Sequence, residues 1–97
     1  MREVVFGAEA RRNVVNLWEH IAADNLSAAD QMRDRMYEAL ELLAEFPGIG
    51  HQRVDVSNDA YRFWVVRPYV IAYRYDARRL TVVRIVHGAR DFRRIFR

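Results

Sequence analysis

The sequence contains neither cysteine nor lysine among its 97 residues. The absence of cysteine excludes disulfide bonds, thiolate nucleophiles and cysteine-based zinc sites. The absence of lysine excludes a lysine general base or a Schiff-base nucleophile. No apolar run approaches the roughly 20 residues that cross a bilayer, and the charged N-terminus does not have the form of a secretory signal. We therefore expect a cytoplasmic protein that does not associate with membranes.

The length favours one small domain over residues 1–97. Apolar residues make up 52% and charged residues 30% of the chain, a balance typical of a folded globular protein. A chain of this size buries roughly 60–65% of its unfolded surface. That is enough for one core, and we expect no deep, enclosed active site.

All 16 basic residues are arginine, and they are unevenly distributed. Residues 1–50 hold five arginines and nine acidic residues, whereas residues 51–97 hold eleven arginines and four acidic residues. The guanidinium group is planar, permanently charged and suited to carboxylates and phosphates. We therefore predict that one end of the molecule attracts anions, either nucleic acid or an acidic protein segment.

Hydrophobic periodicity in the first half predicts a strand and two helices. Residues 2–6 are rich in Val and Phe and favour a short strand. Apolar residues then recur in steps of three and four from Ala8 to about Asn25. Ser27 to Asp30 have the spacing of a capping box, and Pro47 ends the second helix. Two helices joined by about two residues must be antiparallel, which predicts a helical hairpin.

The second half changes to the short period of strands. A polar connection over residues 47–60 leads to predicted strands at 61–66, 69–75 and 80–87, which form an antiparallel meander. Residues 89–96 favour a short terminal helix. The predicted fold class is α+β, in the order β-α-α-β-β-β with a short C-terminal helix. The helical hairpin would pack on one face of an antiparallel sheet.

The cluster from His87 to Asp91 is the most suggestive of chemistry. His87 could act as an acid or base near neutral pH, and Arg90 could bind a phosphate. The alternative is structural: His87 and Asp91 would cap the final helical turn and Arg90 would face solvent. Spacing alone leaves both interpretations open.

Arginines and tyrosines also occur within the predicted strands. Strict alternation places Arg84 on the same strand face as Leu80, Val82 and Val86. Such arginines could form a basic platform, and the tyrosines near them could stack on bases. These tyrosines are Tyr61, Tyr69, Tyr73 and Tyr75. The alternatives are solvent-facing arginines and tyrosines that fill the core.

Two further observations concern Trp18 and the histidines. Trp18 lies on the apolar stripe of the first helix, which fits either a core position or a partner groove. The three histidines are scattered, so we expect no metal site and no cofactor. No phosphate-binding loop, nucleophile elbow or dinucleotide fingerprint is present.

The assembled pattern resembles the RelE/ParE superfamily of toxins from type II toxin–antitoxin modules. The resemblance extends from about Val4 to Phe96. It depends on the helix end Leu42 to Gly50, the strand pair Arg67 to Arg74 and the closing segment Val83 to Asp91. The last segment, of His-Gly-x-Arg-Asp type, is most similar to the ParE and plasmid-stabilisation branch.

The resemblance implies different chemistry for the two branches. RelE-like members cut messenger RNA on the ribosome, and here Arg53, His87 and Arg90 would be the candidate catalytic residues. The strand arginine of that site is replaced by Val70, and Phe96 stands where a terminal tyrosine is usual. Neither residue can transfer a proton or neutralise a phosphate. The ribonuclease is therefore the alternative function.

ParE-like members instead poison DNA gyrase by binding it, and this is the function that the resemblance implies. The implied target-binding residues are Arg84, His87, Arg90, Arg93 and Arg94. A cognate antitoxin with an acidic, amphipathic C-terminal segment would neutralise the toxin in a larger hetero-oligomer. The implied antitoxin-binding residues are Trp18, Met36, Tyr37, Arg62 and Arg74. A toxin that no longer harms cells and only binds its antitoxin is a third hypothesis.

Overall fold

The computed structural model describes residues 1–52 and 61–95, with the side chains of residues 93–95 excepted. The order of elements confirms the predicted α+β class. In chain order the elements are β1 (Glu3–Phe6), α1 (Ala8–Asp24), α2 (Leu26–Glu45), the 3-10 turn η1 (Pro47–Ile49), β2 (Arg62–Val66), β3 (Tyr69–Tyr75), β4 (Arg79–His87) and α3 (Gly88–Ile95).

The four strands form one sheet in the order β1-β4-β3-β2. The pairs β2–β3 and β3–β4 are antiparallel, as the predicted meander requires. β1 differs, because it pairs with β4 in parallel, with Val4 opposite Leu80. Parallel neighbours need a long crossover, and the chain between β1 and β4 provides one. The sheet is therefore mixed rather than wholly antiparallel.

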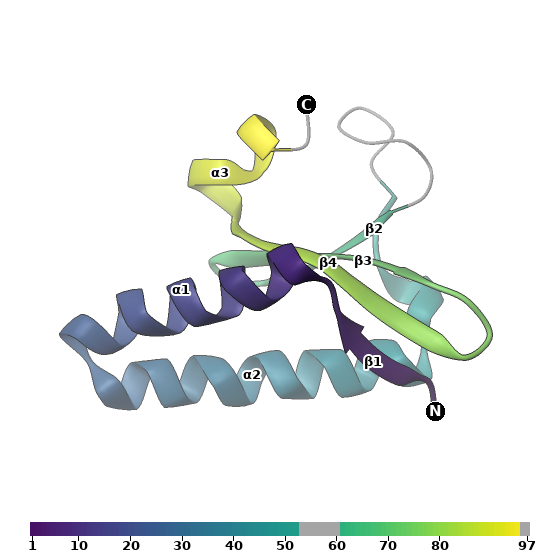
Figure 1. Ribbon diagram of the computed structural model, residues 1–97, viewed down its shortest axis with the longest axis horizontal. Coiled ribbons are helices and arrows are strands. Elements are labelled where there is room, and N and C mark those ends of the chain that lie inside the picture. Colours follow the sequence, from purple (N-terminus) through teal and green to yellow (C-terminus); the bar gives the residue numbers. More distant parts are fainter. Residues whose placement is uncertain (53–60, 96–97) are drawn as a thin grey trace.

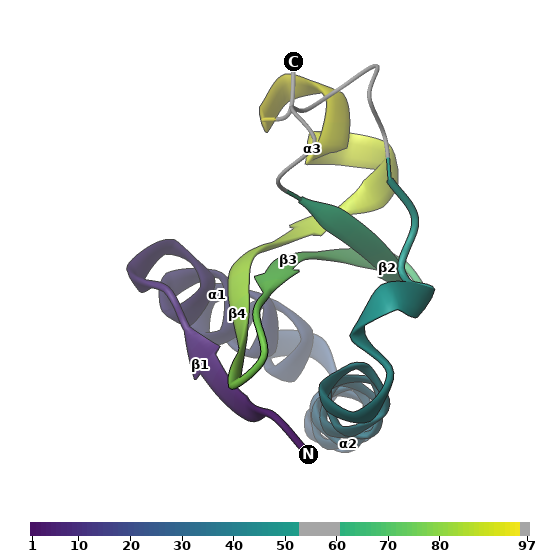
Figure 2. The ribbon, with the colours of Figure 1, turned by 90° about the vertical axis from the view of Figure 1, so that its right-hand side faces the viewer.

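The helical hairpin covers one face of this sheet, and α3 lies on the other side (Figures 1 and 2). α1 and α2 run side by side in opposite directions, as predicted. Their apolar stripes and the facing strand residues form the main core. Its buried members are Ala10, Leu17, Met32, Met36, Ala39, Leu40, Leu43, Val66, Tyr69, Ile71, Tyr73, Leu80, Val82 and Ile85.

A second, smaller cluster lies under α3 on the opposite face of the sheet. It contains Phe63, Ala72, Val86 and Phe92. The rings of Phe63 and Phe92 meet edge to face, with centroids 5.2 Å apart. This geometry is favourable for aromatic pairs. The sheet is therefore buried on both faces at the end where α3 begins.

Asn25 joins the two helices of the hairpin. Its backbone N–H donates to the Ile21 carbonyl and ends α1, and its side-chain Oδ1 accepts from the Ala28 N–H at 3.0 Å. The prediction of a cap at Ser27 was therefore wrong by two residues. Asparagine is an equally good N-cap, and its earlier position shortens the connection to a single residue.

A register shift in β4 changes the faces predicted for that strand. Ala72 pairs with Arg84, whereas the next residue of β3 pairs with Val82, so Val83 is the extra residue of a β-bulge. Leu80 and Val82 face the helical hairpin, while Val86 belongs to the cluster under α3. The prediction that Arg84 shares a face with Leu80 and Val82 was therefore wrong, because the bulge reverses the alternation.

None of the helices in the described ranges combines the length and apolar character that crossing a bilayer requires.

Candidate functional site: an apolar groove between two helices

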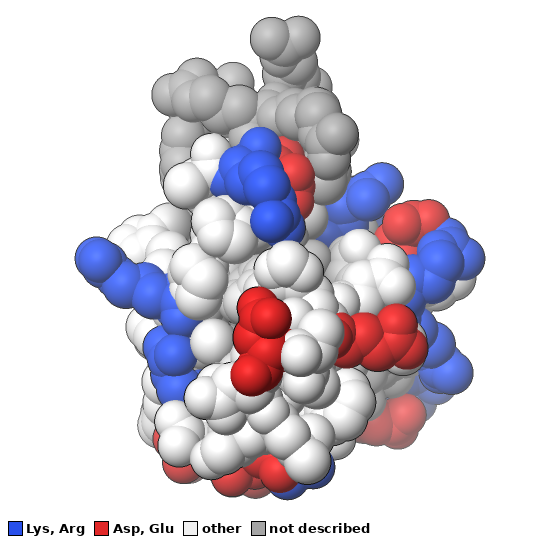
Figure 3. Space-filling view, turned by 90° about the vertical axis from the view of Figure 1, so that its left-hand side faces the viewer, with Lys and Arg blue, Asp and Glu red and all other residues white. Residues whose placement is uncertain are grey.

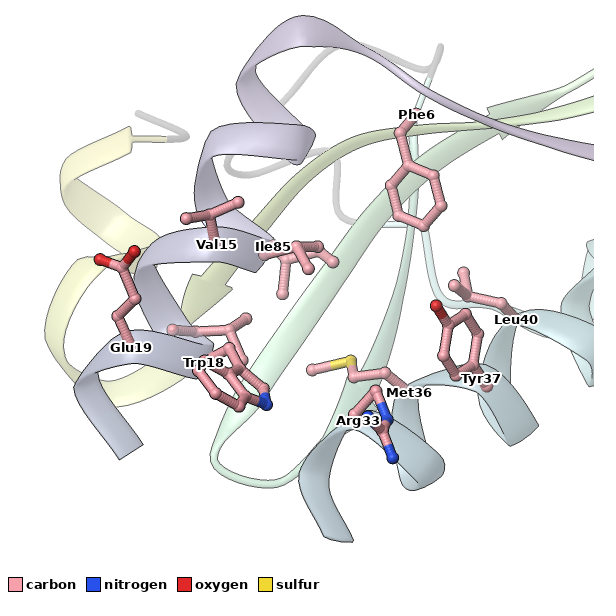
Figure 4. Close-up of a pocket in the computed structure, with 11 residues that line it drawn as sticks. Phe6, Val15, Trp18, Glu19, Arg33, Met36, Tyr37, Leu40 and Ile85 are labelled. Carbon is pink, nitrogen blue, oxygen red and sulfur yellow. The ribbon is translucent and has the colours of Figure 1, made fainter. Parts of the chain in front are cut away.

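α1 and α2 do not close completely against each other, and an apolar groove of about 300 Å³ remains between them. Trp18 lines it from α1, and Met36 and Tyr37 line it from α2 (Figure 4). Phe6 and Ile85 contribute from the sheet below. The groove is thus formed where the two helices diverge over the end of β1 and the middle of β4.

The floor of the groove is buried and its walls are exposed. Met36 and Leu40 on the floor are nearly inaccessible to solvent. On the walls, Val15 is 53% exposed and Tyr37 is 57% exposed. Exposed apolar side chains that surround a concave surface indicate a site for another molecule rather than an ordinary protein surface.

Charged groups occur only at the edge of this groove among its lining residues. Glu19 and Arg33 are the two charged lining residues, and both are exposed. The Arg33 guanidinium lies 3.8 Å from Asp30 and 3.6 Å from Asp34, so its own helix partly neutralises it. The groove is therefore suited to the apolar face of an amphipathic helix.

The structure brings together only part of the predicted antitoxin-binding set. Trp18, Met36 and Tyr37 line the groove. Arg62 instead donates from Nη1 to the Gly50 carbonyl at 2.9 Å, at the edge of the sheet. Arg74 is exposed, and it follows the core residue Tyr73 in β3, so it faces away from the helical hairpin.

Sequence reasoning did not assign Phe6 or Val15 to this site. The helical stripe included Val14 and Trp18, and Val15 lies between them on the outer edge of that stripe. Phe6 comes from a strand that is distant in sequence from α2. The one sequence signal for this site was Val15, an apolar residue beside the stripe where a polar residue is usual.

His87 has a structural role at the start of α3. Its Nδ1 accepts a hydrogen bond from the backbone N–H of Arg90 at 3.2 Å, which is the geometry of an N-cap. Arg90 Nε lies 3.3 Å from Asp91 Oδ2. The capping interpretation of this cluster is therefore correct for His87, while Asp91 pairs with Arg90 rather than with His87.

The other predicted target-binding residues are dispersed. Arg84 Nη1 lies 3.5 Å from Glu9 Oε2, which ties the middle of β4 to the first turn of α1. A hydrogen bond from Arg12 and the charges of Arg12 and Arg84 lower the pKa of Glu9 below its ordinary value. The side chains of Arg93 and Arg94 lie outside the described residues, as does the whole of Arg53.

The second-half arginines that the structure describes are spread along the sheet. Arg78 and Arg79 lie at the start of β4, and Arg90 follows its end, about 25–30 Å away for a strand of nine residues. On the face seen in Figure 3, arginines and acidic residues form small separate groups around uncharged surface. Arg53, Arg97 and the side chains of Arg93 and Arg94 lie outside the described residues, so one basic end stays a prediction.

Comparison with known proteins identifies the family. The model of the ParE toxin of type II toxin–antitoxin systems (parDE) matches residues 4–92. The chain belongs to the ParE toxin family. A solved structure described as the chromosomal ParDE toxin–antitoxin system of P. aeruginosa superposes on this ParE-family chain with a TM-score of 0.72. That comparison covers 90% of this chain and 96% of the other at 16% identity, and it establishes the fold alone. No curated protein matches the chain.

The tyrosines of this ParE-family sheet are mostly core residues. Tyr69 and Tyr73 are buried in the main cluster. The Tyr73 hydroxyl accepts from the Gly50 N–H at 3.0 Å and donates to the Pro47 carbonyl at 2.6 Å. Burial raises the pKa of Tyr73 above its ordinary value. The hypothesis of a base-stacking surface is therefore wrong for these two residues.

The described part of this ParE-family toxin contains no group of three or more His, Asp or Glu residues placed to hold a metal ion.

Proposed function

We propose that this ParE-family toxin inhibits DNA gyrase by binding it, and that a cognate antitoxin neutralises the toxin by filling the groove between α1 and α2. The single observation that carries the antitoxin part is the exposed apolar groove lined by Trp18, Met36 and Tyr37. Membership of the ParE branch supports gyrase as the target.

The shape of the groove favours an amphipathic helix as the neutralising segment. Its walls leave Val15 and Tyr37 more than half exposed in the free chain. Covering apolar surface contributes about 25 cal/mol for each Å² removed from water. A helix that inserts two or three apolar side chains would therefore bind mainly by burial.

An antitoxin segment that contacts Arg62 or Arg74 must be longer than one that only fills the groove. Arg62 lies beside Gly50 at the edge of the sheet, and Arg74 lies on the face opposite the helical hairpin. A single short helix in the groove cannot contact both positions. We infer that the antitoxin segment continues past the groove and that its acidic residues reach at least one of these arginines.

The antitoxin part is tested with two substitutions of equal exposure. Val15 is 53% exposed in the groove, and Val65 is 52% exposed on β2 outside it. Val15→Glu places an unpaired charge where the antitoxin would cover the groove. The variant should therefore arrest growth and escape rescue by the antitoxin encoded beside the toxin. Val65→Glu should arrest growth and be rescued. Equal rescue of both variants would remove the groove from the proposal.

The gyrase part is tested with purified toxin and purified gyrase. The expected result is inhibition of supercoiling, together with a DNA-damage response in cells that express the toxin. Normal supercoiling, with prompt arrest of translation and cleavage of transcripts, would favour the RelE-like ribonuclease. In that case His87→Ala and Arg90→Ala should abolish cleavage. Expression with no growth arrest would instead support a toxin that retains only antitoxin binding.

A further inference from the structure

A second cleft, of about 360 Å³, lies between α1, the end of β4 and the first turn of α3. We call it the polar cleft. It is separate from the apolar groove and shares only Leu17 and Ile85 with that lining. Polar side chains from all three elements line it: Asn13, Asn16, His20, His87, Arg90 and Asp91.

Asn13 presents donors to the polar cleft. Its Oδ1 accepts a hydrogen bond from the Ile85 backbone N–H at 3.0 Å. A backbone N–H can only donate, so the atom facing Ile85 must be the amide oxygen. The Nδ2 group, with two hydrogens, therefore remains available for a ligand.

The same reasoning fixes the tautomer of neutral His87. Its Nδ1 accepts from the Arg90 N–H, so the hydrogen of the neutral ring is on Nε2. The ring packs edge to face against Tyr69, with centroids 5.7 Å apart, which restricts its orientation. His87 thus caps α3 with one nitrogen and offers a donor with the other.

Arg90 supplies the permanent charge. Its Nε lies 3.3 Å from Asp91 Oδ2, so this carboxylate, which also lines the cleft, partly neutralises it, while its Nη atoms have no hydrogen-bond partner in the part of the chain that the structure describes. Its side chain is 60% exposed at the mouth of the polar cleft. His20, on the exposed side of α1, faces the same space and adds a further imidazole donor.

We propose that the polar cleft binds a phosphate monoester of nucleotide size. Donors from α1, the end of β4 and α3 surround a common space, which suits the three terminal oxygens of a tetrahedral phosphate better than the two oxygens of a carboxylate. The volume exceeds that of a bare phosphate and leaves room for an attached sugar. This binding does not depend on the target of the toxin.

The proposal is tested by titrating the isotope-labelled full chain with adenosine 5′-monophosphate and following backbone amide NMR signals. Adenosine and inorganic phosphate are titrated separately. Saturable shifts should centre on residues such as Asn13 and His87, and inorganic phosphate should compete, whereas adenosine should cause no saturable shift. An oligonucleotide with a 5′ phosphate that binds more tightly than the nucleotide assigns the site to a strand end, and the reverse order assigns it to a free nucleotide.

Variants distinguish specific binding in the polar cleft from non-specific attraction of the anion to exposed arginines. Arg90→Gln should weaken binding about tenfold or more, and His20→Gln a few-fold. Arg78→Gln is the matched control, because Arg78 is exposed at the opposite end of β4. Neither His20→Gln nor Arg90→Gln removes the His87 cap. Equal weakening by Arg78→Gln, or binding of adenosine as tight as that of the nucleotide, would overturn the proposal.

Discussion

Replacing Tyr73 with phenylalanine tests the contact that holds the end of α2 against the sheet. The Tyr73 ring is fully buried, and its hydroxyl bonds both the Gly50 N–H and the Pro47 carbonyl. Both backbone groups belong to the turn that follows α2. Phenylalanine keeps the ring and its packing but leaves this donor and this acceptor without a partner.

The expected cost follows from those two groups. A buried donor or acceptor that loses its partner costs about 1–3 kcal/mol, so the loss of both bonds in Tyr73→Phe should lower the free energy of unfolding by about 2–6 kcal/mol. That is a large share of the 5–15 kcal/mol (order of magnitude) that stabilises a typical domain. For a chain of this length it corresponds to a fall of about 10 °C or more in the melting temperature.

Gly50→Ala should disturb the same contact from the other side. A Cβ atom at Gly50 would overlap the Tyr73 hydroxyl and lie 2.8 Å from ring atoms Cε1 and Cζ. The ring is buried and cannot move away cheaply, so about 1–3 kcal/mol of overpacking is expected. Gly48→Ala is the matched control, because its Cβ would meet only the Tyr75 hydroxyl, at an ordinary 3.6 Å.

Urea unfolding measures all three variants, and a shift of the midpoint at constant slope reports stability. The pH provides an independent test. Burial raises the pKa of Tyr73 in the folded state, so its contribution is complete below the ordinary value of 10.0 and is lost as the pH rises through the folded pKa. Wild type should therefore lose stability in alkali more steeply than Tyr73→Phe. A Tyr73→Phe variant within about 0.5 kcal/mol of wild type would refute the reasoning.

Three further changes have expected outcomes. Asn25→Ala should lower the free energy of unfolding, measured in urea, by about 1 kcal/mol, whereas Ser27→Ala should change it little. A larger effect at Ser27 than at Asn25 would indicate that Ser27 is the N-cap of α2. Hydrogen bonds from two backbone N–H groups of the β3–β4 turn, at 2.8 Å each, lower the pKa of Asp76. Its contribution to stability is present above the ordinary pKa and is lost as the pH falls through the folded pKa. The free energy of unfolding should therefore fall less on acidification in Asp76→Asn than in wild type. An equal fall in both proteins would show that Asp76 does not contribute to the pH dependence. Phe92→Ala should cost about 3 kcal/mol and speed proteolysis within α3, and an unaltered cleavage rate would contradict the packing against Phe63.

The helical hairpin and the meander could be predicted because their signals are local. Apolar residues at helical spacing, a proline at position 47 and β-rich segments separated by short turns each act within a few residues. Helical spacing places Trp18 and Met36 on apolar stripes, whereas the family resemblance alone implied that these two residues and Tyr37 bind an antitoxin. Each lies on or beside an apolar stripe, and two stripes joined by a tight turn must face each other.

The bulge at Val83 and the parallel pairing of β1 could not be predicted in this way. One extra residue in β4 moves Arg84 to the opposite face from Leu80, and nothing in the local sequence marks it. Whether β1 joins the sheet beside β4 or β2 depends on where the whole hairpin crosses. That choice is decided by packing across the entire domain.

The sequence by itself determined the elements, their order, the apolar stripes and the resemblance to the ParE family, because these depend on residue type and short-range spacing. Only the tertiary structure decided which face of the sheet Arg84 occupies, that an apolar groove remains between the two helices, and that His20 lines the same cleft as Arg90. These relations join residues up to about 70 positions apart in the sequence. Their geometry is set by strand register and by how the helices pack, which no local pattern encodes.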